Sequence, residues 1–451
     1  KEAQNEQNCP TLIIGKTLMG KGCVDADNKA FDNRCSIHGQ PVGKAGGDFA
    51  KTVVHLGGNP DEPFQILPEV ADYYAKKLAE KAEYAKQRKA EDTAWAAQHP
   101  EMAEKLQKFL TNDFEFPDMS GLDFSKPTAT RSASGKVLGA LYGKVENLVV
   151  SSADLSNSDN TNGYLAKTKA FTNGDFSGAF LQAGVCELSM AALCCGMALH
   201  GGVFPLCGTF FVFSDYIKPV LRVAALMKTP MIFLYTHDSF RVGEDGPTHQ
   251  PIEHEAQMRL MEQLNHHDGK QAVLVLRPGD GYETIKAYDM AVKNQGCPTV
   301  MICSRQNIEA LPQGNFECQL CRAGQIEKGA YTVCQTGATA DIVLVANGSE
   351  VATLVGAAPI IAEKSGKSVR VVSMISPRVF LNQGAAYKEE ILPASAKVFG
   401  LTAGLPSVFC TVISDLNNVF GLDHFGHSAP AGVLDEKFGF KPEIVADKVL
   451  K

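Results

Sequence analysis

The densest group of chemically reactive side chains lies between Thr236 and Pro251, in the segment THDSFRVGEDGPTHQP. It holds two histidines, three acidic residues and an arginine, separated by glycine and proline. Imidazoles and carboxylates can move protons, and a guanidinium can bind an anion. The preceding run 231–235 is apolar and predicts a buried strand. Because open α/β sheets bind ligands at the carboxyl ends of their strands, we predict a ligand site here rather than a solvated loop.

The elements around this segment alternate between strands and helices. Four short apolar runs predict strands, at 148–150, 231–235, 272–276 and 299–303. An apolar helix is expected at 187–200, and a second cycle of strand, helix and strand at 342–345, 349–364 and 369–372. Such alternation is typical of parallel sheets covered by helices on both faces. The predicted fold class is therefore α/β, with tandem three-layer parallel-sheet domains.

The first hundred residues differ in character. The apolar run Thr11–Ile14 predicts a buried strand, and a polar, glycine-rich stretch follows it. Residues 68–110 are rich in Ala, Lys and Glu and predict helix with a break at His99-Pro100. We interpret them as a solvated segment that connects two domains.

Composition limits the classes of function. The 451 residues carry a net charge of −7, so no overall basic field indicates a nucleic-acid partner. No run of 18 uncharged apolar residues and no signal peptide occurs, so we expect no membrane partner. The 13 scattered cysteines favour a reducing, cytoplasmic location. The isolated Cys318-x-x-Cys321 pair is a weak metal or redox signal, and we predict no metal there.

Blocks along essentially the whole chain resemble transketolases, the thiamin-diphosphate enzymes that move a two-carbon ketol unit between sugar phosphates. Besides residues 236–251, they are Ala129-Thr130-Arg131, Ser151–Leu155, Gly208-Thr209-Phe210, Ser304–Asn307, Asn347–Glu350, Asp423-x-Phe425-Gly426 and Phe438-Gly439-Phe440. The resemblance implies four regions: the tail of a diphosphate-binding domain (1–67), a helical linker (68–124), a pyrimidine-binding domain (125–318) and a C-terminal domain (319–451). It implies a cytoplasmic homodimer of the pentose phosphate pathway that transfers glycolaldehyde from a ketose phosphate to an aldose phosphate.

The resemblance also assigns residues to the cofactor and the reacting centre. Glu187 matches the glutamate that shares a proton with the aminopyrimidine ring, although alone it could be a helix cap. His249 and His38 match histidines that line the reacting centre. Aromatic and acidic residues of the cofactor region are matched by Phe210, Phe213, Tyr216 and Asp154. Without the resemblance, the three aromatic residues would be interpreted as core.

The resemblance assigns a second set of residues to the binding of the sugar phosphate. Arg131, Ser158, His237 and Arg305 match the phosphate-binding set, and Asp245 matches a residue that contacts a substrate hydroxyl. Two guanidinium groups suit a phosphate dianion. These residues are distant in sequence, so the fold must bring them together.

The family also uses Mg²⁺, held by a Gly-Asp-Gly motif and a later Asn. Gly279-Asp280-Gly281 followed by Asn307 imitates that pattern, but its block, RPGDGYE, matches a different segment of the family. We therefore expect the Mg²⁺ ligands before residue 1, in a diphosphate-binding domain of which this chain lacks most. The isolated chain is then expected to be inactive.

Three alternatives stay open. One is another thiamin-diphosphate enzyme, such as dihydroxyacetone synthase. Another is a two-chain E1-type transferase, and the third is a non-catalytic fragment or assembly partner.

Overall fold

The computed structural model describes residues 2–113, 115–312 and 323–451. The chain divides into two compact units between Pro100 and Glu101. In the first unit the described helices are α1 (Glu2–Asn5), η1 (Cys35–Ile37), α2 (Val42–Ala45), α3 (Phe49–His55) and the long α4 (Pro68–Gln98). The predicted break is confirmed, because α5 (Pro100–Thr111) follows after His99 alone. Proline at the next position disfavours the α conformation at His99, whose φ and ψ are −132° and 62°.

The strand predicted at Thr11–Ile14 is wrong. No strand forms among residues 2–100, where a single bridge pairs Val24 with Ala30. The side chains of Leu12 and Ile13 are 84% and 79% exposed. A strand of a parallel sheet is held by its neighbours, and no described residue of the first unit pairs with this run.

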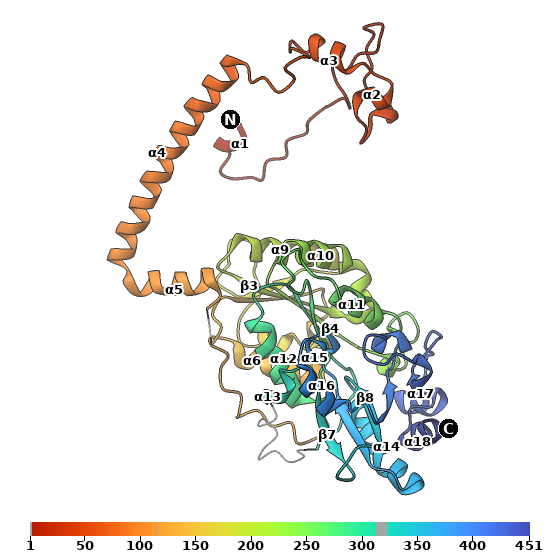
Figure 1. Ribbon diagram of the computed structural model, residues 1–451. Coiled ribbons are helices and arrows are strands. Elements are labelled where there is room, and N and C mark those ends of the chain that lie inside the picture. The colour runs from red at the N-terminus through yellow and green to blue at the C-terminus, as the bar shows by residue number, and fades with distance from the viewer. Residues whose placement is uncertain (1, 114, 313–322) are drawn as a thin grey trace. The chain divides into compact units, whose positions relative to one another are not determined.

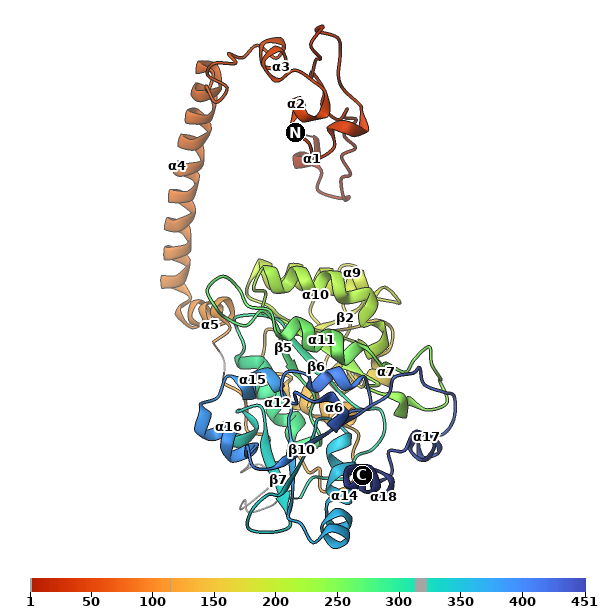
Figure 2. The ribbon, with the colours of Figure 1, turned by 45° about the vertical axis from the view of Figure 1, so that its right-hand side comes forward.

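The second unit contains a six-stranded sheet in which every pairing is parallel. In spatial order its strands are β2 (Phe180–Gln182), β1 (Leu148–Ser152), β3 (Phe204–Phe210), β4 (Ile232–Thr236), β6 (Thr299–Ile302) and β5 (Leu274–Leu276). Figures 1 and 2 show α9 (Glu187–His200), α10 (Ser214–Leu226) and α11 (His254–Glu262) along one face of this sheet, with α6 (Thr130–Leu141) and α12 (Gly281–Lys293) along the other.

Side chains alternate between these two faces. Phe233 and Tyr235 pack with α9, α10 and α11, whereas Ile232 and Leu234 pack in the core that includes α6 and α12. Successive residues of a strand point to opposite faces, so a strand covered on both sides is apolar throughout. The continuous run from Met231 to Tyr235 reflects this double coverage.

A second, five-stranded sheet follows in the same unit. Its order is β11 (Val419–Phe420), β10 (Lys397–Leu401), β8 (Ile342–Ala346), β9 (Val369–Ser373) and β7 (Tyr331–Gln335), and only the edge strand β7 runs antiparallel. The remaining described helices are α7 (Ser156–Asp159), α8 (Asn162–Leu165), α13 (Ala323–Ile326), α14 (Glu350–Ser365), α15 (Pro377–Leu381), α16 (Ala385–Ile391), α17 (Ala431–Phe438) and α18 (Pro442–Leu450), with the 3-10 turns η2 (Phe211–Phe213), η3 (Phe240–Val242), η5 (Pro406–Phe409) and η6 (Leu416–Asn418).

The predicted α/β class and the predicted strands of both sheets are confirmed. Strands β2, β7, β10 and β11 were not predicted. Strand β3 was also missed, because Pro205 and Gly208 lower its apparent strand propensity. Its pairing on both sides, with β1 and β4, outweighs that propensity. Among the described residues no helix is both long and apolar enough to cross a membrane.

Candidate functional site

Most of the predicted site residues of the second unit follow the carboxyl ends of five of the six parallel strands. Because these strands are parallel, their carboxyl ends meet at one edge of the sheet. The segments that leave this edge carry Asp154 and Ser158 after β1, Glu187 after β2, Phe213 after β3, His237 after β4 and Arg305 after β6. The topology therefore gathers side chains that the sequence separates by up to about 150 positions.

Arg131, in the first turn of α6, joins two of these segments. Its Nη1 donates to the carbonyl oxygen of Ser158 at 2.5 Å and lies 3.3 Å from Nε2 of His237. Among the described residues, no carboxylate lies within ion-pair distance of Arg131 or Arg305, and Nε of Arg131 is buried without a partner. Burial, together with the charge of Arg305, lowers the pKa of Arg131. Two guanidinium groups without a paired carboxylate form a site suited to an anion.

His237 is held rigidly beside this arginine. It is 2% exposed, and its ring stacks on Phe210 with a centroid separation of 3.6 Å. Its Nδ1 lies 2.9 Å from Oγ1 of Thr236, so with Arg131 donating to Nε2 the ring proton is assigned to Nδ1. Burial, and then the charges of Arg131 and Arg305, lower the pKa of His237 to about 2. The backbone of His237 is left-handed, with φ +63°, a strained conformation typical of functional loops.

This low pKa predicts a measurable pH effect. The folded pKa of about 2 lies below the ordinary imidazole value of 6.5, so between these pH values the unfolded imidazole binds a proton and the folded one does not. The stability contributed by His237 is complete above pH 6.5 and falls with pH below it. At pH 5 the loss is about 2 kcal/mol. Urea unfolding at pH 7.5 and pH 5 should show this extra loss in the wild type but not in His237→Asn, because Asn has no group that titrates in this range. Asn also tolerates a positive φ, so the variant should fold. Equal pH dependence in both proteins would contradict the assignment of a neutral, buried imidazole.

Aromatic rings continue from His237 towards solvent. The rings of Phe210 and Phe213 lie parallel at 5.9 Å, and His249 approaches Phe213 edge-on at 5.5 Å. Tyr216 lies 6.2 Å from Phe213 and is 61% exposed. Aromatic rings that run from a buried position to solvent in this way can stack on a planar ligand and exclude water from it. Asp154 follows β1 and has a φ of +62°, and Asp245 lies between His237 and His249 in the sequence. Both aspartates are exposed.

Glu187 begins α9 and is only 8% exposed. No described residue donates a hydrogen bond to its carboxylate, so a capping role has no hydrogen bond to support it. A buried carboxyl group that is free of protein partners can share a proton with a ligand nitrogen. His38 belongs to the first unit, where it ends η1 and is exposed, and its role stays a prediction.

Asp159 was missed by the sequence-based analysis. It is completely buried beneath Ser158, and its carboxylate accepts hydrogen bonds from Ser152 Oγ at 2.7 Å and from both the backbone N–H and Oγ1 of Thr161. Burial raises the pKa of Asp159 to about 6. These bonds tie the end of β1 to the turn that presents Ser158. Only the flanking Ser and Thr residues could have suggested such a network.

The residues that imitate the Mg²⁺ motif, Asp280 and Asn307, form structural hydrogen bonds. No group of three or more His, Cys, Asp or Glu among the described residues could hold a metal ion. Asp280 caps α12, where its two carboxylate oxygens accept from the backbone N–H groups of Glu283 and Leu311. Asn307 accepts from the N–H of Ala129 at 3.2 Å. Asp280 and Asn307, which resemble the Mg²⁺ motif in sequence, therefore form hydrogen bonds that stabilise the fold. The Cys318 and Cys321 pair lies outside the described residues.

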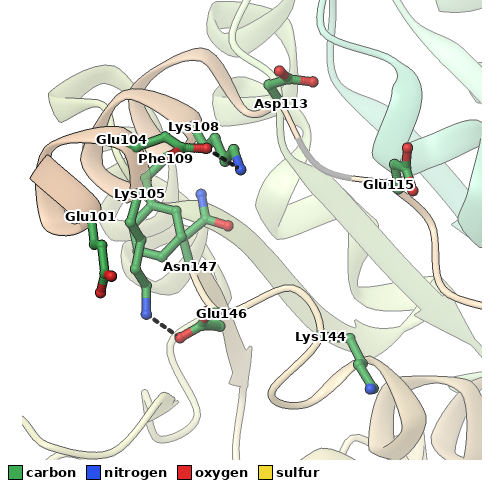
Figure 3. Close-up of a pocket in the computed structure, with 10 residues that line it drawn as sticks. All are labelled: Glu101, Glu104, Lys105, Lys108, Phe109, Asp113, Glu115, Lys144, Glu146 and Asn147. Carbon is green, nitrogen blue, oxygen red and sulfur yellow. Dashed lines mark hydrogen bonds and ion pairs between the residues drawn. The ribbon is translucent and has the colours of Figure 1, made fainter.

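A separate hollow of about 590 Å³ lies beside α5 and is lined by charged side chains (Figure 3). Lys105 pairs with Glu146, and Lys108 pairs with Glu104 at 2.9 Å. None of the predicted site residues lines it. Because it contains none of those residues, and four of its eight charged side chains are paired with one another, we do not include it in the candidate site.

Comparison with protein families matches three domain descriptions along the chain. They are "Transketolase, thiamine diphosphate binding domain" for residues 1–114, "Transketolase, pyrimidine binding domain" for 126–310 and "Transketolase-like TK C-terminal domain" for 329–441. The first match does not support the expectation that the chain lacks most of the diphosphate-binding domain, because that description extends well past the expected tail at 1–67.

Individual relatives agree with the family match. The chain is 35% identical to the chloroplastic transketolase of Craterostigma plantagineum, over 99% of this chain and 82% of the relative. It is 36% identical to the Bacillus subtilis transketolase, over 100% of this chain and 65% of the relative. A Pichia stipitis transketolase solved with sedoheptulose 7-phosphate superposes with a TM-score of 0.84 and 30% identity, over 100% of this chain and 63% of that one. The chain thus spans less than two thirds of the length of the last two relatives. From the family descriptions and these identities, it belongs to the transketolase family.

Proposed function

We propose that this chain acts in transketolase catalysis, the reversible transfer of a two-carbon ketol unit from a ketose phosphate to an aldose phosphate. The observation that carries the proposal is the pair Arg131 and Arg305, which lie beside the neutral, buried His237 with no described carboxylate in ion-pair contact. A phosphate dianion would supply the missing negative charge. Sugar phosphates are bound by a structural relative, the Pichia stipitis enzyme.

The other candidate residues are proposed to act around this anchor. Ser158 lies next to Arg131, and we propose that its hydroxyl adds a neutral donor to the phosphate site. Asp245 would accept a hydrogen bond from a substrate hydroxyl. His249, and His38 of the first unit, would hold or move protons at the reacting carbons. With the phosphate fixed at one end, these groups would meet a single stretch of the sugar chain.

Thiamin diphosphate, when bound, supplies the carbon nucleophile that ketol transfer needs. We propose that Glu187 holds its aminopyrimidine by a shared proton, while Phe210, Phe213 and Tyr216 pack around the ring and exclude water. Asp154 is proposed as a further contact of the cofactor region. Mg²⁺ is expected to accompany the diphosphate. We assign it no ligand among the described residues, because no suitable cluster occurs in them.

The test of the phosphate site is Arg305→Ala. We expect KM for D-xylulose 5-phosphate to rise about 10- to 100-fold, since a charge-assisted bond to the phosphate is lost. KM for unphosphorylated D-xylulose should change little. The control is Arg378→Ala, which removes a half-buried arginine bonded to Asn265 in the same unit. Equal effects of Arg305→Ala on both sugars would remove Arg305 from the phosphate site.

Dihydroxyacetone synthase is the rival function, because that enzyme shares much of the 236–251 segment. Assays with formaldehyde and with ribose 5-phosphate as acceptors separate the two activities. Calorimetry of the chain with thiamin diphosphate, with and without Mg²⁺, tests the expectation that the isolated chain is inactive. Tight, metal-dependent binding followed by ketol transfer would contradict that expectation.

We further propose a homodimer in a reducing, cytoplasmic compartment. Support for the dimer comes from apolar side chains that α9 and α10 leave exposed, among them Leu193 at 54%, Val223 at 47% and Leu226 at 63%. Beside them lies an apolar hollow of about 700 Å³ on α9. Exposed apolar surface of this extent marks an interaction face. The buried free thiols, such as Cys194 and Cys207, favour a reducing location.

A further inference from the structure

The loop from His237 to Gln250, here called the substrate loop, is held along its length by the C-terminal part of the chain. The contacts come from three segments, at residues 347–353, 426–428 and 435–440, which we call the C-terminal clamp. Three blocks of the transketolase resemblance that received no role above lie in these segments: Asn347–Glu350, the Gly426 end of Asp423-x-Phe425-Gly426, and Phe438-Gly439-Phe440.

Arg241 is the central contact of the loop. It is 5% exposed, and its guanidinium uses all three nitrogens. Nη1 donates to Glu350 at 2.7 Å and to Ser349 at 3.0 Å, Nη2 donates to Thr353 at 3.2 Å, and Nε donates to Asp435 at 2.7 Å. An arginine with every nitrogen engaged cannot move without breaking several charge-assisted bonds.

Glu350 also reaches the start of the loop through Arg277. Its second oxygen accepts from Nη1 of Arg277 at 2.5 Å, and Nη2 of Arg277 donates to Asp238 at 2.6 Å. Asp238 directly follows His237. One buried carboxylate of the C-terminal clamp therefore fixes both Asp238 and Arg241, which lie three residues apart.

The end of the loop is held by the 426–428 segment. Nε2 of Gln250 donates to the carbonyl oxygens of Gly243 at 2.8 Å and His427 at 2.9 Å. Oγ of Ser428 donates to the carbonyl oxygen of Glu244 at 2.6 Å. The approach is so close that a Cβ at Gly426 would collide with the Gln250 side chain, which explains glycine at this position.

Aromatic packing completes the contact. The ring of Phe240 lies between Phe438 at 5.2 Å and Phe440 at 4.9 Å. Phe240 itself is completely buried. The loop residues that contact the clamp directly are thus 240, 241, 244 and 250, and Asp238 is joined to the clamp through Arg277. These positions are interspersed with the proposed site residues His237, Asp245 and His249.

We propose that the C-terminal clamp positions the substrate loop, with Arg241, Glu350 and Asp435 as positioning residues for sugar-phosphate binding. The inference rests on the proposed function for the identity of the ligand. The loop needs such support because His237, a residue other than glycine, has a φ of +63°, and strained backbone persists only where its surroundings hold it. The C-terminal domain is then a working part of the substrate site, although it supplies no group that touches substrate.

The experiment compares Asp435→Asn with Asp447→Asn in the full chain. Both aspartates lie on C-terminal helices and form ion pairs of 2.7 Å, but Asp447 pairs with Lys364, which is remote in sequence from the loop. Hydrogen exchange of the amides of 240–249 should become about tenfold faster in Asp435→Asn and stay unchanged in Asp447→Asn. Affinity for D-xylulose 5-phosphate by calorimetry should fall about threefold to tenfold in the first variant alone. Arg241→Lys, which keeps the charge but cannot bond all four partners of the guanidinium, should have a larger effect than Asp435→Asn.

Two results would overturn the inference. One is unchanged exchange of the loop amides in folded Asp435→Asn and Gly426→Ala. The other is faster exchange spread evenly over the C-terminal domain, which would indicate a merely structural role. Ser428→Ala removes only the exposed hydroxyl that bonds Glu244, so it provides a folded variant if the others unfold. The exchange measurement needs no substrate. A wild-type chain that binds no sugar phosphate would therefore contradict the proposed function, while the exchange data would still decide whether the clamp holds the loop.

Discussion

Glu187→Ala is expected to lower kcat for ketol transfer by about 10²- to 10⁴-fold, the usual contribution of a positioned proton-sharing group. The carboxyl group lies at the start of α9, is almost fully buried and receives no hydrogen bond from a described residue. Its proposed partner is therefore the cofactor ring. Alanine is the best helix former, so α9 and the fold should persist.

The measurement is kcat together with thiamin diphosphate affinity by calorimetry, which gives a readout independent of turnover. Glu443→Ala is the matched control, because Glu443 also lies in the first turn of a helix, α18, and is exposed. It should leave both quantities unchanged. Near-normal turnover and affinity in folded Glu187→Ala would show that Glu187 has no role in the cofactor site.

Arg277→Met should destabilise the protein by about 3–5 kcal/mol, the usual cost of leaving buried charges without a partner. Arg277 is 1% exposed and lies within hydrogen-bonding distance of three carboxylates, those of Asp238, Glu255 and Glu350. The charges of Glu350, Glu255 and Asp238 raise the pKa of Arg277 against the opposing effect of burial. Without the guanidinium, Asp238 keeps no cation in ion-pair contact among the described residues.

The free energy of unfolding in urea measures this loss. Adding Asp238→Asn to Arg277→Met should restore part of the stability, because the carboxylate left unpaired is then neutral. Lys228→Met is the control: its pair with Asp268 at 2.6 Å is exposed, so the expected loss is below about 1 kcal/mol. A loss from Arg277→Met no larger than this control would contradict a structural role for the buried cluster.

The strands and helices that could be predicted from the sequence are those whose pattern depends on residues close together in the chain. Apolar runs predicted β1, β4, β5, β6, β8 and β9, and the helix predicted at 187–200 coincides with α9. The same rule failed at Thr11–Ile14, because an apolar run becomes a strand only where partner strands are available. It also missed β3, whose Pro205 and Gly208 conceal a strand that its two neighbours stabilise.

By itself, the sequence determined the α/β class, the family and the side chains that could do chemistry, because periodicity and motifs depend on residues close together in the chain. Tertiary structure alone decided which of these side chains meet. It brought Arg131 to His237, gave His237 a neutral imidazole through burial beside two guanidinium groups, and assigned Asp280 to a helix cap. It also placed Glu350 between Arg241 and Arg277. The physical reason is that burial and electrostatic fields depend on distances in space between residues that the chain keeps far apart.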